Sequence, residues 1–170
     1  MIFWVGVSSY KAAVIAVLKD RARQLTHKPR IYFEEWDDPL ISGIRWVSEL
    51  IEVAGGSDCF AENALQPLGK NRIIADPCDV IARQPDIIIG SWCGKKFRPK
   101  RVAQRPGWDQ IPAVQNGHIY EIKSAEILQP GPACLTDGLN QLLRIITLWQ
   151  DDPHCNSRFA RTATDSLPTD

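Results

Sequence analysis

The segment 86–90, with the sequence DIIIG, is the feature that most restricts the fold of this chain. Its three consecutive isoleucines leave no polar position to face water, which is typical of a central strand covered on both faces. Pro85 precedes the segment, and Gly90 permits the sharp turn that must follow it. Because such a strand needs helices on both sides, the sequence predicts an α/β protein.

Helices and strands are expected to alternate along most of the chain. Two further strands, rich in aromatic and β-branched residues, are expected at 30–36 and 118–122. Apolar spacing and helix-starting residues predict helices around 9–26, 44–54, 76–84, 98–104 and 135–149. This alternation predicts a three-layer α/β sandwich with a mostly parallel sheet.

Turn signals and composition complete the predicted organisation. The segment 37–43, DDPLISG, is expected to be a loop, and Asn116-Gly117 between two β-like runs predicts a hairpin or a tight turn. The end of the chain is polar and aperiodic, so a flexible tail is expected there. The chain is thereby divided into an N-terminal segment, an α/β lobe and a tail, at 1–28, 29–150 and 151–170.

Charge and cysteine content exclude several classes of function. Lys+Arg and Asp+Glu both number 20, so bulk charge provides no attraction for nucleic acid or an anionic membrane. No apolar run reaches the ~20 residues that span a bilayer. Lys11 divides the apolar start of the chain, which favours a helix over an export signal. No cysteine pair has CxxC spacing, so no zinc site or disulfide is expected, and mostly buried free thiols are expected at Cys59, Cys78, Cys93, Cys134 and Cys155.

Two loops are expected to meet at one edge of the sheet, because ligands bind beyond the carboxyl ends of parallel strands. The first loop carries Trp36, Asp37 and Asp38, and the second carries Trp92 and Cys93. The indole of Trp92 is expected to be exposed. Indoles offer flat apolar area and neighbouring polar groups can fix a ligand's orientation, so the sequence predicts a binding site at this edge.

A third loop and two other uses of these residues complete the candidates. The loop 124–133 follows the last predicted strand and brings Gln129. Asp37 and Asp38 could form half of a metal site, although adjacent carboxylates more often serve a turn. Cys93 could be the nucleophile of a hydrolase, although none of the three histidines is near it in sequence. No dinucleotide-binding, P-loop or GxSxG motif is present.

Several ordered stretches resemble cobalamin-binding members of the periplasmic substrate-binding protein family. They read YFEEWDDPLISGIRWVSELIEVAGGSDCFAE, PDIIIGSWCGKKF, RPGWDQIPAVQNGHIYEI and ILQPGP, and the similarity runs from about 14 to 149. The resemblance implies two α/β lobes joined by a long helix, with a corrinoid in the cleft between them. This sequence is similar to the end of that connecting helix and to the second lobe, and we expect it to be a truncated form.

The same resemblance implies what the chain does. It implies a non-catalytic substrate-binding component of an ABC importer, periplasmic or extracellular, with cobalamin or a related corrinoid as the transported ligand and no cofactor. A haem or iron–siderophore receptor lobe is the alternative, because the fold alone does not choose the ligand. The partners implied are the importer's permease and, through an apolar stripe on the linker helix at Val14, Leu18 and Leu25, a second copy of the chain.

Positions that match the family's motifs receive roles from the resemblance. In the family, a glutamate on the lobe's outer surface can dock an arginine of the permease. Cys78 occupies that position here, so the docking role is assigned to Asp76 and Asp79 beside it. The loops that face the cleft imply ligand contacts at Trp36, Asp37, Asp38, Trp92, Cys93 and Gln129.

Overall fold

A computed structural model describes residues 27–153 of the chain. The predicted helix 9–26, the dimer contact assigned to it, Cys155 and most of the predicted tail lie outside the described residues. Within 27–153, no helix is both long enough and apolar enough to cross a membrane.

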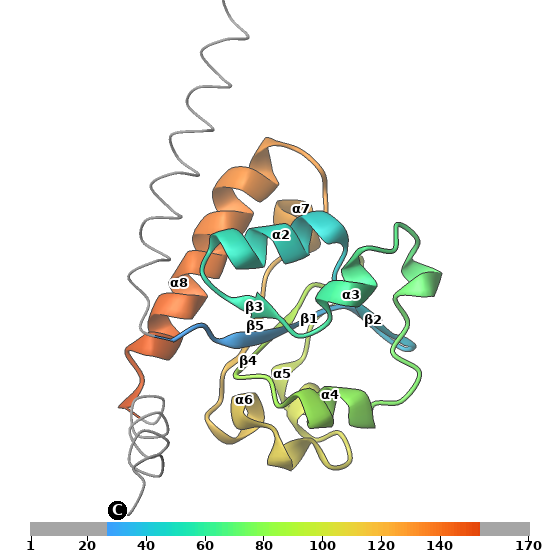
Figure 1. Cartoon of the computed structure of the whole chain (residues 1–170), viewed down its shortest axis with the longest axis vertical. Coiled ribbons are helices and arrows are strands. Elements are labelled where there is room, and N and C mark those ends of the chain that lie inside the picture. The colour runs from blue at the N-terminus through green and yellow to red at the C-terminus, as the bar shows by residue number, and fades with distance from the viewer. Residues whose placement is uncertain (1–26, 154–170) are drawn as a thin grey trace, which may run out of the picture.

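A mostly parallel sheet of five strands forms the centre of the described region (Figure 1). The strands are β1 Arg30–Asp37, β2 Leu40–Ser42, β3 Ser57–Asp58, β4 Ile87–Gly90 and β5 Ile119–Glu121. β1 pairs in parallel with β3 and β4, and β4 pairs in parallel with β5. β2 runs antiparallel to β1, which makes the order β2-β1-β4-β5. The predicted mostly parallel sheet is confirmed.

Helices cover both faces of this sheet and produce three layers (Figure 1). One outer layer contains α2 Arg45–Val53, α7 Ser124–Ile127 and α8 Leu139–Gln150, the last preceded by a π-helical turn at Cys134–Gly138. The opposite layer contains α4 Cys78–Arg83, α5 Pro99–Ala103 and α6 Pro112–Gln115. The connections include α3 Ala61–Ala64 and 3-10 turns at Gly69–Asn71 and Trp108–Gln110.

The isoleucine run of β4 lies at the centre of both apolar clusters. Ile87 and Ile89 pack with the residues of α2 and α8, whereas Ile88 packs with those of α4 to α6. None of the three exposes any surface. Successive side chains of a strand point to opposite faces, so an unbroken apolar run is required when both faces are covered.

Two predicted helix boundaries are confirmed by their hydrogen bonds. Asp76 accepts a hydrogen bond from the backbone N–H of Cys78 at 2.8 Å, which satisfies a donor in the first turn of α4. α2 ends where Gly55 takes a left-handed φ of 95°, a conformation that favours glycine. These local signals were readable because each depends on residues only a few positions apart.

The loop predicted over 37–43 and the hairpin predicted at Asn116-Gly117 are wrong, whereas the alternative of a tight turn at Asn116-Gly117 is confirmed. The segment 37–43 is not a loop throughout, because Leu40–Ser42 forms β2 after a turn at Asp38-Pro39. Asn116-Gly117 ends a helix and does not connect two strands, since α6 precedes it and β5 follows it. Gly117 has a φ of 75°, and a left-handed glycine serves the end of a helix as well as it serves a hairpin.

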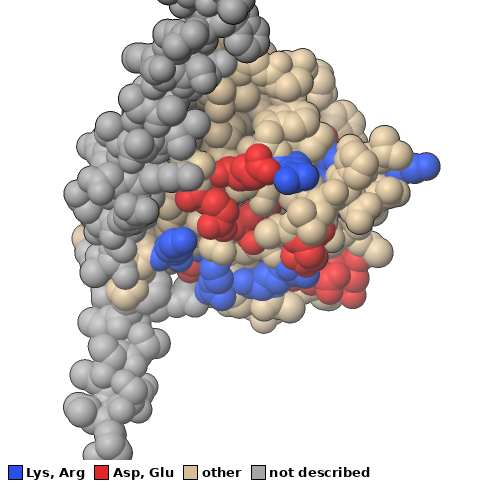
Figure 2. All heavy atoms as spheres, turned by 45° about the horizontal axis from the view of Figure 1, so that its top comes forward, with Lys and Arg blue, Asp and Glu red and all other residues tan. Residues whose placement is uncertain are grey.

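Charges of both signs share the surface, in keeping with the zero net charge. On the face shown in Figure 2, acidic groups gather in the middle of the view with basic groups beside them. Lys28 pairs with Glu52 at 3.9 Å, and Arg45 pairs with Glu49 at 2.9 Å one helical turn away. These pairs are well exposed, so they contribute little to stability.

Gly90→Ala is expected to lower the free energy of unfolding by about 1–3 kcal/mol, because the added methyl group would overlap the buried ring of Phe97. Gly131→Ala is the matched control, since nothing lies within 4 Å of the position of its Cβ. Urea unfolding measures both variants. Equal unfolding midpoints for the two would contradict the close packing described for Gly90.

Candidate functional site

The carboxyl ends of β1, β4 and β5 lie at one edge of the sheet, because these strands are parallel neighbours. Trp36 and Asp37, predicted to lie in a loop, are the last residues of β1, and Asp38 lies in the turn that follows. The structure brings this end of β1 together with the loop that follows β4. Lys95 donates hydrogen bonds to both carboxylate oxygens of Asp37, at 2.7 and 2.8 Å. Its ammonium lies 5.4 Å from the centre of the Trp36 ring and 5.2 Å from that of Trp92. Lys95 therefore joins the two loops.

Trp92 is buried, so the predicted exposed indole is wrong at this position. Its side chain is 4% exposed and packs edge-to-face on Phe97, with ring centres 4.9 Å apart. Its Nε1 donates to Glu34 at 3.0 Å, which satisfies the polar atom of the indole inside the protein. The sequence could not show that the buried carboxylate of Glu34, near the end of β1, accepts this hydrogen bond.

The other candidates at this edge keep some access to solvent. Trp36 is half-buried, and its Nε1 donates to the backbone oxygen of Asp38 at 2.9 Å. Asp38, Cys93 and Gln129 are exposed. Within 27–153, no hydrogen bond or ion pair joins Gln129 to the loops of Trp36 and Cys93. The structure thus brings two of the three loops into contact, and the ligand contacts stay a prediction.

A buried cluster around Glu34 supports the edge from beneath, and the sequence did not indicate it. Glu34 is fully buried and accepts hydrogen bonds from Arg105 at 2.6 and 2.9 Å, and from the hydroxyl of Tyr32 at 3.0 Å. The Arg105 guanidinium also lies 4.4 Å from the centre of the Trp108 ring. The only available signal was the pair Glu34-Glu35 inside an otherwise aromatic strand.

Glu34 and burial shift the pKa values of two groups in this cluster, Tyr32 and Arg105. Burial, and then the charge of Glu34, raise the pKa of Tyr32 well above its ordinary value, so the phenol stays protonated and donates. Burial lowers the pKa of Arg105, but its hydrogen bond to Glu34 and the charge of that carboxylate raise it by more. The cluster is therefore a charged pair with neutral donors around it.

Glu35, the next residue, has an arginine of its own. Arg72 is 1% exposed and contacts Glu35 through Nη2 at 2.7 Å. It also donates from Nε to the backbone oxygen of Ser42 at 3.2 Å, and from Nη1 to the backbone oxygens of Gln66 and Pro67 at 3.1 and 3.3 Å. Arg72 thereby connects the backbone of Gln66 and Pro67 to Glu35 of β1 and Ser42 of β2.

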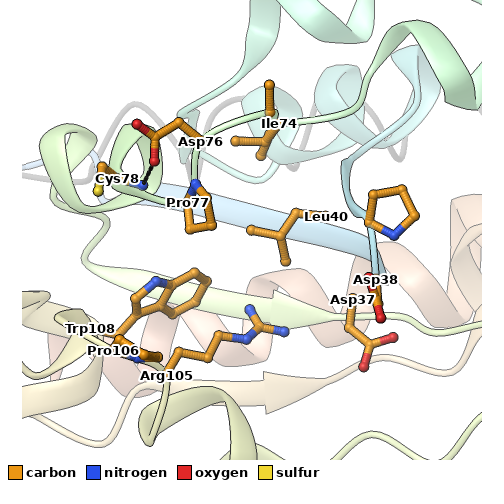
Figure 3. Close-up of a pocket in the computed structure, with 12 residues that line it drawn as sticks. Asp37, Asp38, Leu40, Ile74, Asp76, Pro77, Cys78, Arg105, Pro106 and Trp108 are labelled. Carbon is orange, nitrogen blue, oxygen red and sulfur yellow. Dashed lines mark hydrogen bonds between the residues drawn. The ribbon is translucent and has the colours of Figure 1, made fainter.

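A pocket of about 490 Å³ opens beside the β1–β2 turn (Figure 3). Its apolar side chains include Leu40, Ile74 and Trp108, and carboxylates of Asp38 and Asp76 stand at its rim. Cys78 and Arg105 are further lining residues. The pocket is therefore lined both by Asp38, a candidate ligand residue, and by Asp76, a candidate docking residue. Asp79 is exposed on α4 and is not part of the lining.

The metal and hydrolase alternatives have no structural support in the part of the chain described. No group of three or more His, Cys, Asp or Glu residues in 27–153 is placed to hold a metal ion. Cys93 follows the carboxyl end of β4, whereas His118 precedes β5 and His27 precedes β1, at the opposite edge of the sheet. Both described histidines therefore lie at the edge opposite to Cys93, and His154 lies outside the described residues.

The cysteines differ in access, so the expectation of mostly buried thiols is wrong in part. All four described cysteines are free, with Cys134 buried, Cys59 half-buried, and Cys78 and Cys93 exposed. Burial is the main cause that raises the pKa of Cys59 to about 12. A hydrogen bond to Asp76, and then its charge, raise the pKa of the exposed Cys78 thiol.

Comparison with known proteins shows one consistent likeness. Residues 8–126 match the family model described as periplasmic binding protein. A vitamin B12-binding protein of Vibrio parahaemolyticus is 29% identical over 113 residues, which cover 65% of this chain and 38% of that protein. The alignment therefore includes well under half of that relative.

Solved structures share the fold at low sequence identity. A possible iron-binding periplasmic solute-binding protein of Staphylococcus epidermidis superposes with a TM-score of 0.67 at 20% identity, over 81% of this chain and 52% of that one. The periplasmic vitamin B12-binding protein of Vibrio cholerae superposes with a TM-score of 0.61 at 19% identity, over 83% and 52%. The chain thus spans about half the length of these solved relatives.

Glu34→Gln is expected to lower the free energy of unfolding by about 3 kcal/mol, because it leaves the guanidinium of Arg105 without its buried carboxylate partner. Glu49→Gln removes the same charge from an exposed pair and should cost less than about 1 kcal/mol. Both are measured by chemical denaturation at neutral pH. A Glu34→Gln variant as stable as Glu49→Gln would show that the buried pair is not needed.

Thiol labelling should follow access and pKa, because the thiolate is the form that reacts. Cys93 is expected to be alkylated well before Cys59, which is half-buried and has a pKa of about 12. Asp76→Asn should accelerate labelling of Cys78, since it removes the charge that raises the pKa of that thiol. Peptide mass spectrometry over a time course measures each site. Labelling of Cys59 before Cys93 would contradict the placement of both loops.

Proposed function

The chain belongs to the periplasmic binding protein family, and from this we propose that it is the ligand-binding lobe of a substrate-binding component that supplies a corrinoid such as cobalamin to an ABC importer. It acts by binding and carries out no reaction. The ligand is cargo and not a cofactor. Cobalamin is favoured over other cargo because the curated relative that aligns with this chain is a vitamin B12-binding protein.

One observation carries this proposal, namely the joined loops at the carboxyl edge of the sheet. Lys95 holds Asp37 with two hydrogen bonds, which fixes the end of β1 that presents the half-buried indole of Trp36. A flat aromatic face at a rigid edge suits the broad, partly apolar surface of a corrin ring. The exposed carboxylate of Asp38 and amide of Gln129 suit the amides at its rim.

A haem or an iron–siderophore complex is the second candidate cargo. It is supported by the structural likeness to the possible iron-binding protein of Staphylococcus epidermidis, which has the same fold. The same edge of the sheet would serve this cargo, because planar aromatic area suits haem as it suits a corrin. The choice between the two is therefore a matter for direct binding measurements.

The permease of the importer is the proposed partner, and the start of α4 is the proposed docking position. Asp76 and Asp79 are exposed there, and Asp76 stands beside the apolar pocket shown in Figure 3. Carboxylates on an exposed surface can pair with cationic side chains of a partner and steer its approach. The proposed site of action is the periplasm or the extracellular face of the membrane, as for the family.

Trp36→Ala is expected to weaken binding of cyanocobalamin by on the order of 2 kcal/mol, because it removes the accessible aromatic face at the edge. Leu148→Ala, an exposed apolar residue on α8, is the control and should bind as the wild type does. Equilibrium dialysis with cyanocobalamin, haemin and ferrichrome measures affinity and ranks the cargo. This proposal would be contradicted if the chain bound none of the three ligands, or if wild type and Trp36→Ala bound equally well.

A further inference from the structure

The segment 95–101, with the sequence KKFRPKR, concentrates positive charge at the candidate site. Two residues of the segment have a structural role, because Phe97 is buried in the core and Pro99 begins α5. Its other five residues are basic and exposed. Within 27–153, Lys95 has Asp37 as an ionic partner, whereas no ion pair involves Lys96, Arg98, Lys100 or Arg101. Since the whole chain has no net charge, this excess is local.

The excess lies next to the loops assigned to the ligand. The segment follows the carboxyl end of β4 directly, and Gly94 before it has a φ of 68° with no atom within 4 Å of a Cβ there. The loop therefore projects into solvent at the same edge of the sheet as Trp36. Cations on such a loop attract anions over several ångströms and raise their local concentration.

Lys95 is oriented so that its charge, and not that of its partner, faces solvent. Asp37 has a side chain that is 3% exposed, whereas the side chain of Lys95 is 37% exposed. An ammonium has three donors, and two of them contact Asp37. One donor is therefore left for a group that approaches from outside, and the two indoles hold the ammonium in place.

We infer that the cargo presents an oxyanion, either a carboxylate or a phosphate, to Lys95 and Lys96 at this edge, an inference that rests on the proposed function. Lys95 contributes its remaining N–H donor, and Lys96, the next residue, contributes a second exposed ammonium. Arg98 and the cations of α5 extend the positive field around this point. The apolar ring of the cargo then lies toward Trp36 and its charged substituent lies toward the segment 95–101.

The test compares ligands that share a ring and differ in anionic groups. Haemin is paired with haemin dimethyl ester, which lacks free carboxylates. Cyanocobalamin is paired with dicyanocobinamide, which lacks the phosphate together with the ribose and base attached to it, so for this pair the lysine variants decide whether the phosphate is the group recognised. The anionic member of the pair that binds should bind about tenfold more tightly, as for a hydrogen bond to a charged group. Its affinity should also fall as sodium chloride is raised, because salt screens exposed charges.

Lys95→Met and Lys96→Met should each reduce this preference, and Lys95→Arg should keep most of it because the charge is retained. Lys28→Met is the matched control, since this exposed lysine lies before β1 at the opposite edge of the sheet. Unfolding midpoints check that each variant is folded. If Lys95→Met is unstable through loss of its bond to Asp37, the comparison of Lys96→Met with Lys28→Met decides.

Two outcomes separate this inference from the proposed function. Equal binding of both members of a pair by the wild-type chain, or an unchanged preference in Lys95→Met and Lys96→Met, overturns the inference and leaves the proposed function in place. Failure of the wild-type chain to bind any of the four ligands overturns the proposed function, and the inference with it.

Discussion

The rest of the structure depends on two neighbouring carboxylates that β1 carries into the protein. Glu34 and Glu35 are consecutive, and each is neutralised by an arginine from a distant segment, Arg105 and Arg72 respectively. Removing a carboxylate from water is unfavourable unless an opposite charge and hydrogen bonds replace the water. The two arginines meet that requirement, and in doing so they fix the segments that carry them against the carboxyl end of β1.

These buried pairs support the arrangement of the candidate site. Glu34 also accepts the indole N–H of Trp92, whose ring lies under the ammonium of Lys95. Lys95 in turn holds Asp37, so a chain of contacts leads from the core to Trp36 at the end of β1. An edge supported in this way keeps its arrangement without a ligand, and in general such preorganisation reduces the entropy cost of binding.

The sequence predicts the elements of this fold better than the contacts between them. The isoleucines of β4, the start of α4 at Asp76 and the end of α2 at Gly55 are all recognisable because their signals are local. The pairing of Glu34 with Arg105 joins residues 71 positions apart, and no local pattern marks it. The burial of Trp92 is equally hidden from a local pattern, because its indole N–H donates to Glu34, 58 positions away. The edge of the sheet was predictable from strand order, but its polar support was not.

The order of the strands along the chain has a consequence for synthesis of the protein. β1 leaves the ribosome before the other described strands, yet its parallel neighbour β4 and the arginine that neutralises Glu34 are made much later. Contacts between residues so far apart slow folding, because the intervening chain must be ordered before they form. We therefore expect the emerging half of this lobe to stay unfolded until α5 has been made, and to need protection from aggregation during that interval.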